Sequence, residues 1–397
     1  MVAHVVGRSA YAVRYNRGMN NSVRLLQAAA AQADRLDKWL ARKVQMRFNV
    51  LAQRVEIFEE DREVWRELRD VDATDLSYMY FGSTGNEVSS FRVHETLRAV
   101  AYKIKYDPLK EHLLALPDWD RTPRLDSWLA SCIGAEQTEY TKIVGHKWLL
   151  AAIARALSPG CKVDGVLILH GKQGVGKSTL LRDLATDQFF SEADFDFSRP
   201  QEAGMALRGC WIHEWAELDN MSRATHTRLK AFISETRNVF RPPYGRETID
   251  EPRRCIFAGS SNKDDFLTDT TGNRRFWPVK VGKYDQDLFL KMRDQLLAEA
   301  LLAYQADEMW WLTPEEEALA EAPRSMVEHE APWTGPLRDF LDGRAEVTVI
   351  EALEALSVPL ERVDIRAQAR VAGILRRLGY FQNGRVNGKR SWTLVRP

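Results

Sequence analysis

Eight residues near the middle of the chain restrict its fold more than any other feature. The segment Gly171–Ser178 reads GKQGVGKS and matches the pattern GxxxxGK[ST]. Its glycines let the backbone curl so that successive N–H groups point inward, and a helix starting near Lys177 adds the positive end of its dipole. Backbone donors and a helix dipole aimed at one point favour phosphate groups, so the segment predicts a P-loop.

The residues around this segment argue against a chance match in a glycine-rich loop. The apolar run Val166–Leu169 precedes it and the amphipathic stretch Thr179–Ala185 follows, as the strand and helix of a P-loop require. Lys177 is then expected to reach the β- and γ-phosphates of ATP, and the Ser178 hydroxyl to bind Mg²⁺. The predicted nucleotide-binding residues are Gly171, Gln173, Gly174, Val175, Gly176, Lys177, Ser178 and Thr179.

Two further apolar runs place this segment in an α/β domain. Cys210–Ile212 and Cys255–Ala258 are short and continuously apolar, like Val166–Leu169, and helical patterns separate the three runs. Strands that alternate with helices are typical of a sheet covered on both faces. We therefore predict an α/β P-loop domain over residues 161–310.

Acidic residues follow the second of these runs. Glu214 comes two residues after Ile212, and Glu217 and Asp219 follow it. A carboxylate there would hold the water shell of Mg²⁺ together with Ser178 and polarise the attacking water. Glu214 is the first candidate for this catalytic and metal-binding role, Glu217 is the second, and Asp219 is expected to be structural. Alternatively, these acids begin a helix, where its dipole favours them.

Polar residues after the third run complete the predicted catalytic set. Asn262 follows the run and is expected to orient the lytic water, although an Asn there can also cap a turn. Arg274 and Arg275 come next and suit an arginine finger that serves a neighbouring subunit. The alternative for the arginines is a structural stack on Phe276 or Trp277. The sequence does not assign one role to each arginine.

The remaining segments are expected to form four further parts of the chain. Residues 1–85 read as a leader and a mainly helical region, 86–160 as a helical domain, and 311–335 as a linker. Residues 336–397 predict a winged helix-turn-helix. Its expected elements are the helices Val349–Leu356 and Arg366–Leu378 and a hairpin, Phe381–Val386 with Lys389–Leu394, around Asn387-Gly388.

Composition excludes several broad classes. The chain of 397 residues has 56 basic and 56 acidic side chains, so its charge does not mark it as a uniformly basic coat protein. Its four cysteines are far apart and lack zinc spacing, which favours reduced thiols. It has no apolar run of membrane-spanning length and no signal-peptide pattern near its start. These features predict a cytoplasmic protein without a membrane partner.

Several ordered motifs resemble one known family. They are Trp119-Asp120, Arg124–Leu129, Trp148, Pro159-Gly160, the P-loop, Trp211–Leu218, Phe240–Arg246 and Thr271–Pro278. Over roughly residues 85–300 they resemble the virulence-associated E family of P-loop ATPases from phages, prophages and other mobile elements. The resemblance implies an AAA+-like core related to superfamily 3 helicases, which act as rings, usually hexamers, on DNA. Many relatives carry an upstream primase-polymerase domain, and the short segment before residue 85 instead favours a separate primase or polymerase.

The resemblance also indicates where DNA would bind. Superfamily 3 enzymes carry a DNA-contacting hairpin before the strand that ends at Asn262, and residues 240–254 occupy this place. The alternative is a plain surface turn, since Pro-Pro-Tyr-Gly is good turn chemistry. The C-terminal module has a basic helix and wing that suit DNA or, alternatively, protein docking. The predicted DNA contacts are Arg241, Tyr244, Arg246, Arg253, Arg370, Arg385, Lys389 and Arg390, with Arg254 as a further candidate.

The leading hypothesis is an ATP-driven DNA helicase or translocase that acts in replication of a mobile element. It would use ATP and Mg²⁺ and work as a homo-oligomer, with a hexamer expected from the resemblance. One rival is a small-molecule kinase, which the winged module and the paired arginines disfavour. The other rival is a nucleotide-controlled DNA-binding initiator or regulator that hydrolyses ATP slowly and does not unwind DNA.

Overall fold

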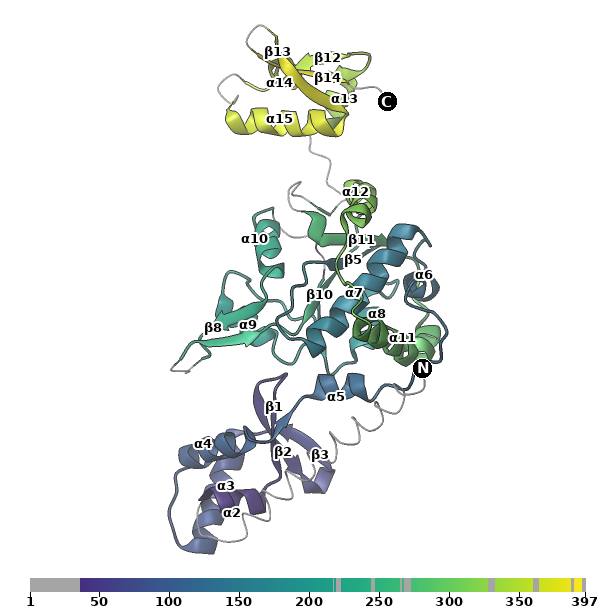
Figure 1. The fold of residues 1–397 in the computed structure, drawn as a ribbon. Coiled ribbons are helices and arrows are strands. Elements are labelled where there is room, and N and C mark those ends of the chain that lie inside the picture. The colour runs from purple at the N-terminus through teal and green to yellow at the C-terminus, as the bar shows by residue number, and fades with distance from the viewer. Residues whose placement is uncertain are drawn as a thin grey trace. The chain divides into compact units, whose positions relative to one another are not determined.

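The computed structural model describes a mixed α/β chain that forms two compact units. It covers residues 36–216, 218, 223–243, 247–264, 266–267, 273–327, 333–359, 364–386 and 389–394. The larger unit holds the described residues up to Asp264 and from Asn273 to Met326. The smaller unit holds Phe266, Leu267 and the described residues from Val327 onward (Figure 1).

The larger unit begins with a small α/β layer rather than the mainly helical region predicted for residues 1–85. Four strands pair in the order β3-β2-β1-β4, and side chains of β1 and β2 share a core with three helices. Met46 and Phe48 alternate into this core as the residues of a strand do. The elements are α2 (Leu36–Lys43), β1 (Met46–Asn49), β2 (Arg54–Glu59), β3 (Val64–Glu67), α3 (Asp70–Thr84), α4 (Ser90–Ala101) and β4 (Lys105–Tyr106).

The predicted boundary at residue 85 is also wrong. α3 and α4 lie on either side of it, yet both contribute to one core that runs from Leu40 to Ala101. Gly85 only separates the two helices, and its φ of 72° suits the end of α3. A turn residue between two helices is therefore not a domain boundary here.

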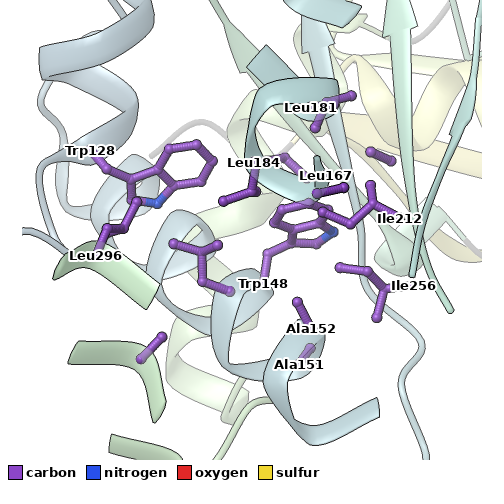
Figure 2. Close-up of a cluster of buried hydrophobic side chains, with 14 of the residues drawn as sticks. Trp128, Trp148, Ala151, Ala152, Leu167, Leu181, Leu184, Ile212, Ile256 and Leu296 are labelled. Carbon is purple, nitrogen blue, oxygen red and sulfur yellow. The ribbon is translucent and has the colours of Figure 1, made fainter. Parts of the chain in front are cut away.

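The helices between residues 108 and 157, predicted as part of a separate domain over residues 86–160, instead cover the central sheet. α5 (Pro108–Leu114), α6 (Trp128–Ile133) and α7 (Glu139–Leu157) share one core with the sheet strands. Figure 2 shows Trp148 of α7 among Leu167, Ile212 and Ile256. The Trp148 indole N–H also donates to the backbone oxygen of Phe257 at 2.9 Å. Because these helices bury their apolar faces on the sheet, they do not have a core of their own.

The central sheet is parallel, as predicted. Its order is β11-β5-β10-β7-β6, so β10 lies between β5 and β7. The three predicted strands correspond to β5, β7 and β10. The strands are β5 (Val166–His170), β6 (Phe190–Ser191), β7 (Ile212–Trp215), β10 (Ile256–Ser261) and β11 (Phe276–Lys280), and the helices between and after them are α8 (Lys177–Ala185), α9 (Pro200–Ala206), α10 (Arg223–Ile233) and α11 (Gln286–Gln305).

The segment predicted as a linker over residues 311–335 contains a helix, α12 (Pro314–Val327). Its Ala320 is fully buried in the core of the larger unit. Arg324 donates to the backbone oxygens of Arg274 and Phe276, which fixes the helix beside the start of β11. The acidic run at the start of this segment lies in the first helical turn, where the helix dipole favours carboxylates.

The smaller unit has the elements predicted from the sequence. Its three strands form an antiparallel sheet in the order β12-β14-β13, and one core joins them to the helices. Thr348 and Glu351 form a capping box at the start of its second helix, while Asn387 and Gly388 lie outside the described residues. The elements are α13 (Thr334–Leu341), β12 (Glu346–Thr348), α14 (Val349–Ala355), α15 (Ile365–Arg377), β13 (Tyr380–Val386) and β14 (Lys389–Leu394).

Among the described helices of both units, none combines the length and the apolarity that crossing a bilayer requires.

Candidate functional site

The loop Gly171–Gly176 joins β5 to α8 in the conformation that its glycines permit. Gly174 and Gly176 have φ angles of 78° and 96°, which side-chain-bearing residues rarely adopt. A Cβ at Gly176 would also lie 2.6 Å from the Cβ of Tyr284, so a larger residue does not fit there. The Tyr284 N–H donates to the oxygen of Val175 at 2.8 Å. Tyr284 therefore packs against the loop at Gly176 and binds its backbone at Val175.

The Lys177 side chain is held inside this loop. Its Nζ donates to the backbone oxygens of Gly171 and Lys172 at 2.9 and 3.0 Å, and to Oδ1 of Asn262 at 3.0 Å. Asn262 directly follows β10, the strand beside β5. The predicted phosphate-binding lysine and the predicted water-orienting amide are therefore in contact.

Ser178 connects the loop to β7. Its Oγ donates to Oε1 of Glu214 at 2.7 Å. Glu214 is 1% exposed, and its Oε2 is buried without a hydrogen-bond partner among the described residues. Burial raises the pKa of this carboxyl group, and the hydroxyls of Ser260 and Ser178 oppose the shift. Glu214 lies inside β7 rather than just after it, because this strand extends to Trp215, beyond the predicted run Cys210–Ile212.

The sheet order explains why these groups meet. Parallel strands present their carboxyl ends at one edge, and ligands of such sheets bind there. β10 lies between β5 and β7, so Asn262 sits between the strands that bear the loop and Glu214. The arrangement combines inward-facing loop amides, an ammonium group and a carboxylate. It can bind a phosphate chain and activate a water molecule beside it.

The same residues fit a magnesium ion. A serine hydroxyl and a carboxylate are the hard oxygen ligands that Mg²⁺ prefers, and the unpartnered Oε2 of Glu214 is a free acceptor beside Ser178. The described residues contain no group of three or more His, Cys, Asp or Glu side chains arranged to hold a metal. Substrate phosphates and water would therefore have to supply most of the coordination.

Other predicted residues of the nucleotide site take different positions. Gln173 is exposed in the loop, and Thr179 is exposed in the first turn of α8. Glu217 and Asp219 lie outside the described residues, so their predicted roles have no structural counterpart here.

The paired arginines lie near the amino ends of β5 and β11, at the opposite end of the strands from the loop. Arg274 and Arg275 precede β11, whose first residue pairs with Val166 at the start of β5. The loop follows the other end of β5, and a strand of this length spans about 16 Å between its two ends. Arg274 is exposed, and Arg275 Nε donates to Ser234 Oγ at 2.8 Å. The chain therefore does not bring these arginines to its own Lys177.

The structure contradicts the predicted DNA contact by Arg253. Its side chain is completely buried, and it donates to the Phe232 oxygen, to Oδ1 of Asn238 and to Oε2 of Glu235. Its guanidinium also lies 4.2 Å from the centre of the Phe232 ring. Burial lowers the pKa of this arginine. A side chain with every donor directed at the protein cannot reach a phosphate.

Arg254, the further candidate, is fixed in a similar way. Its Nη2 donates to Asp107 Oδ2 at 2.8 Å and to the backbone oxygen of Ala156 at 2.9 Å. It therefore joins the sheet to α7 and α5.

We predict that Arg253→Ala lowers the free energy of unfolding by about 2–4 kcal/mol, because it leaves buried acceptors without donors and creates a cavity. Urea unfolding measures this change. Arg241→Ala is the control, since an exposed arginine should cost no more than about 0.5 kcal/mol. If the Arg253→Ala protein had normal stability and weaker DNA binding, the prediction that Arg253 contacts DNA would stand again.

The remaining predicted DNA contacts are only partly described. Arg241 is exposed at the end of the hairpin formed by β8 (Arg237–Phe240) and β9 (Ile249–Pro252), while Tyr244 and Arg246 lie outside the described residues. Arg370 is exposed on α15 and lies 4.7 Å from the centre of the Trp333 ring. Arg385, Lys389 and Arg390 belong to β13 and β14, where their side chains lie outside the description.

Sequence reasoning missed His213, which precedes Glu214. Its ring is buried beside Phe195, Trp215 and Phe257. Burial lowers its pKa to about 3, so the imidazole is neutral at pH 7. A histidine between the apolar run Cys210–Ile212 and Glu214 was the available signal.

The low pKa of His213 has a consequence for stability. Below its ordinary pKa of about 6.5, the unfolded chain gains a proton at this residue that the folded chain does not. Stability should therefore fall as pH decreases, by up to about 1.4 kcal/mol per pH unit. His213→Phe should remove this contribution and flatten the dependence between about pH 5.5 and 4.5. The free energy of unfolding is measured with urea at several pH values. If it depends on pH equally in both proteins, His213 does not have a depressed pKa.

Comparison with known proteins identifies the family. The model of the virulence-associated protein E-like domain matches residues 113–329, which is more than half of the chain. No match to the sequence is found among curated proteins. Two similar solved structures, both apo forms of the NrS-1 C-terminal region, share 14% identity with TM-scores of 0.47 and 0.45. Each covers 91% of this chain and 98% of its own, and a likeness this weak carries no conclusion. On the family match, which includes β5, the loop, β7 and β10, the chain belongs to the virulence-associated protein E-like family.

Proposed function

We propose that this protein is an ATP-hydrolysing P-loop motor that acts on DNA during replication of a phage, prophage or other mobile element. One observation carries the proposal: Lys177 contacts Asn262 while Ser178 contacts Glu214, so three neighbouring strands contribute to one site. These are the residue types and the order that ATP hydrolysis needs.

Each side chain then has a defined task. Lys177 would exchange its loop oxygens for phosphate oxygens when ATP binds, which frees the Asn262 amide to orient a water molecule. Glu214 would accept a proton from that water, and its buried position suits a base with a raised pKa. Ser178 and Glu214 would hold Mg²⁺, which neutralises charge on the phosphates when bound.

An oligomer completes the proposed site. Arg274 and Arg275 lie at the opposite end of the strands from the loop, so an arginine finger has to come from another copy of the chain. This head-to-tail use of two different surfaces generates a ring when the rotation between neighbouring subunits closes. We propose a homo-oligomer, with a hexamer as the expected size for this family.

The DNA contacts of the proposal are the β8–β9 hairpin and the C-terminal unit, which we propose to be a winged helix. Arg241 is exposed on the hairpin and Arg370 on α15, where each could contact phosphates. A separate primase or polymerase would supply priming, and the protein would work in the cytoplasm of the host cell.

The test is ATP hydrolysis by the full chain with and without single-stranded DNA. We expect DNA to stimulate hydrolysis, and Lys177→Ala to lower it about 100-fold or more, because the ammonium group stabilises transferring charge. Lys172→Ala is the matched control, since this neighbouring lysine is exposed and contributes only its backbone oxygen to the Lys177 contacts. DNA-independent phosphorylation of a metabolite would contradict the proposal, and tight DNA binding without strand displacement would favour a regulator.

A further inference from the structure

A cavity of about 770 Å³ lies near the amino ends of β5 and β11, at the opposite end of the strands from the loop. Its walls come from the segment before β5, the start of β11, and the turn between α11 and α12. Pockets of this size commonly accept small organic ligands. Arg274 and Arg275 are part of its lining and are the finger candidates for another subunit, but the proposed ATP site makes no use of the other lining residues.

Three tryptophans form the aromatic part of the cavity. Trp277 lies directly on Gly165, where a Cβ would come within 2.4 Å of its ring. Trp310 is fixed by an indole N–H bond of 2.9 Å to the backbone oxygen of Lys162. Trp311 packs edge-on against Trp310 at 5.3 Å between ring centres, yet remains 52% exposed. A fixed aromatic ring with an open surface is suited to stacking on a planar ligand.

The charged residues of the cavity favour an anion. Lys162 pairs with Asp164 at 3.4 Å, and Glu317 pairs with Arg324 at 2.7 Å. Both acids of the lining therefore have a cation beside them. Arg274 and Arg275 form no ion pair with the described part of the chain, so they leave positive charge in the cavity. Guanidinium groups are well matched to phosphates.

We propose that this cavity binds a nucleotide unit, with the base stacked on Trp311 and the phosphate near Lys162 and Arg274. Stacking surface and cationic groups in one cavity are the two features that single-strand binding sites combine. The unit can come from single-stranded nucleic acid or from a free nucleotide, since both present a base joined to a phosphate. The inference does not rest on ATP hydrolysis, because a protein with a disabled loop can be used to test it.

The experiment uses the full chain with Lys177→Ala, so that binding at the loop is suppressed. Fluorescence anisotropy of a labelled thymidine oligonucleotide measures binding of the strand, and anisotropy of a labelled thymidine monophosphate separately measures binding of the free nucleotide. Trp311→Leu should weaken binding of whichever of the two probes occupies the cavity about tenfold. Trp311→Phe should weaken it less, because phenylalanine keeps an aromatic face. Lys162→Ala should make the logarithmic salt dependence of oligonucleotide binding shallower by about 0.7.

Lys291→Ala is the matched control, since it removes one exposed lysine on α11 away from the cavity. Urea unfolding confirms that the variants are folded, as expected for a half-exposed tryptophan. Weaker binding of the oligonucleotide alone assigns a strand to the cavity, and weaker binding of the monophosphate assigns a free nucleotide. If Trp311→Leu binds both probes as Lys291→Ala does, the proposal is overturned.

Discussion

Glu214→Gln is expected to lower the rate of ATP hydrolysis by about 100- to 10,000-fold, the usual contribution of a general base. Glutamine keeps the shape of the side chain but cannot accept the proton of the attacking water. Its carbonyl oxygen or amide can still pair with the Ser178 hydroxyl, which now contacts Oε1 of Glu214 at 2.7 Å. ATP binding should therefore survive while turnover is lost.

The stability of this variant separates a catalytic loss from unfolding. Burial raises the pKa of Glu214, so at neutral pH its charged form is less favourable in the folded chain than in the unfolded chain. Replacing it with a neutral amide should leave stability at pH 7 equal or higher. Urea unfolding and binding of a fluorescent ATP analogue measure the two properties.

Glu192→Gln is a suitable control for this experiment. Glu192 lies just after β6 and is about half exposed, where it pairs with Arg182 at 2.8 Å. Such a surface pair contributes little, so hydrolysis should remain close to the wild-type rate. If Glu214→Gln turned over ATP as fast as Glu192→Gln, Glu214 would not be the base, and the undescribed Glu217 would become the candidate.

Loss of the arginine finger is expected to have the largest effect, about 1,000- to 100,000-fold on the hydrolysis rate. We predict this loss for Arg274→Ala, because its side chain is exposed, whereas Arg275 is partly engaged by Ser234. Arg275→Ala should cost less activity. Arg98→Ala, an exposed arginine on α4, serves as the control.

Mixing experiments decide whether the finger acts between subunits. Arg274→Ala keeps an intact loop, and Lys177→Ala keeps an intact arginine. In a ring of randomly mixed subunits about a quarter of the interfaces would then combine both intact halves, so two inactive proteins should regain activity together. Absence of recovery in stable mixed oligomers, or a strictly monomeric protein with ATP and DNA, would rule out a shared site.

The contiguous part of the site was predictable from sequence because its chemistry is local. Loop glycines, Lys177 and Ser178 are adjacent, so their spacing alone predicts the turn between β5 and α8 and its proposed phosphate-binding role. Glu214 and Asn262 were also predictable, since each lies at or near the end of an apolar run. Their contacts with Ser178 and Lys177 depend on β10 lying between β5 and β7, which a single sequence does not state.

Other predictions failed for identifiable physical reasons. Arg253 looks like a surface cation in sequence, but its acceptors come from α10, the segment after it, and β8, so only packing shows that it is buried. β11 was not recognised because Pro278 interrupts it, and proline is tolerated there because β11 is an edge strand.

The sequence by itself determined the loop Gly171–Ser178, the parallel α/β sheet around it and the elements of the C-terminal unit. These depend on short-range spacing and hydrophobic periodicity, which are written along the chain. Only the tertiary structure decided that the helices between residues 108 and 157 belong to the core of the sheet, that Arg253 is internal, and that Arg274 lies at the opposite end of the strands from Lys177. Strand order and burial arise from contacts between distant segments, and the pattern of any one segment does not contain them.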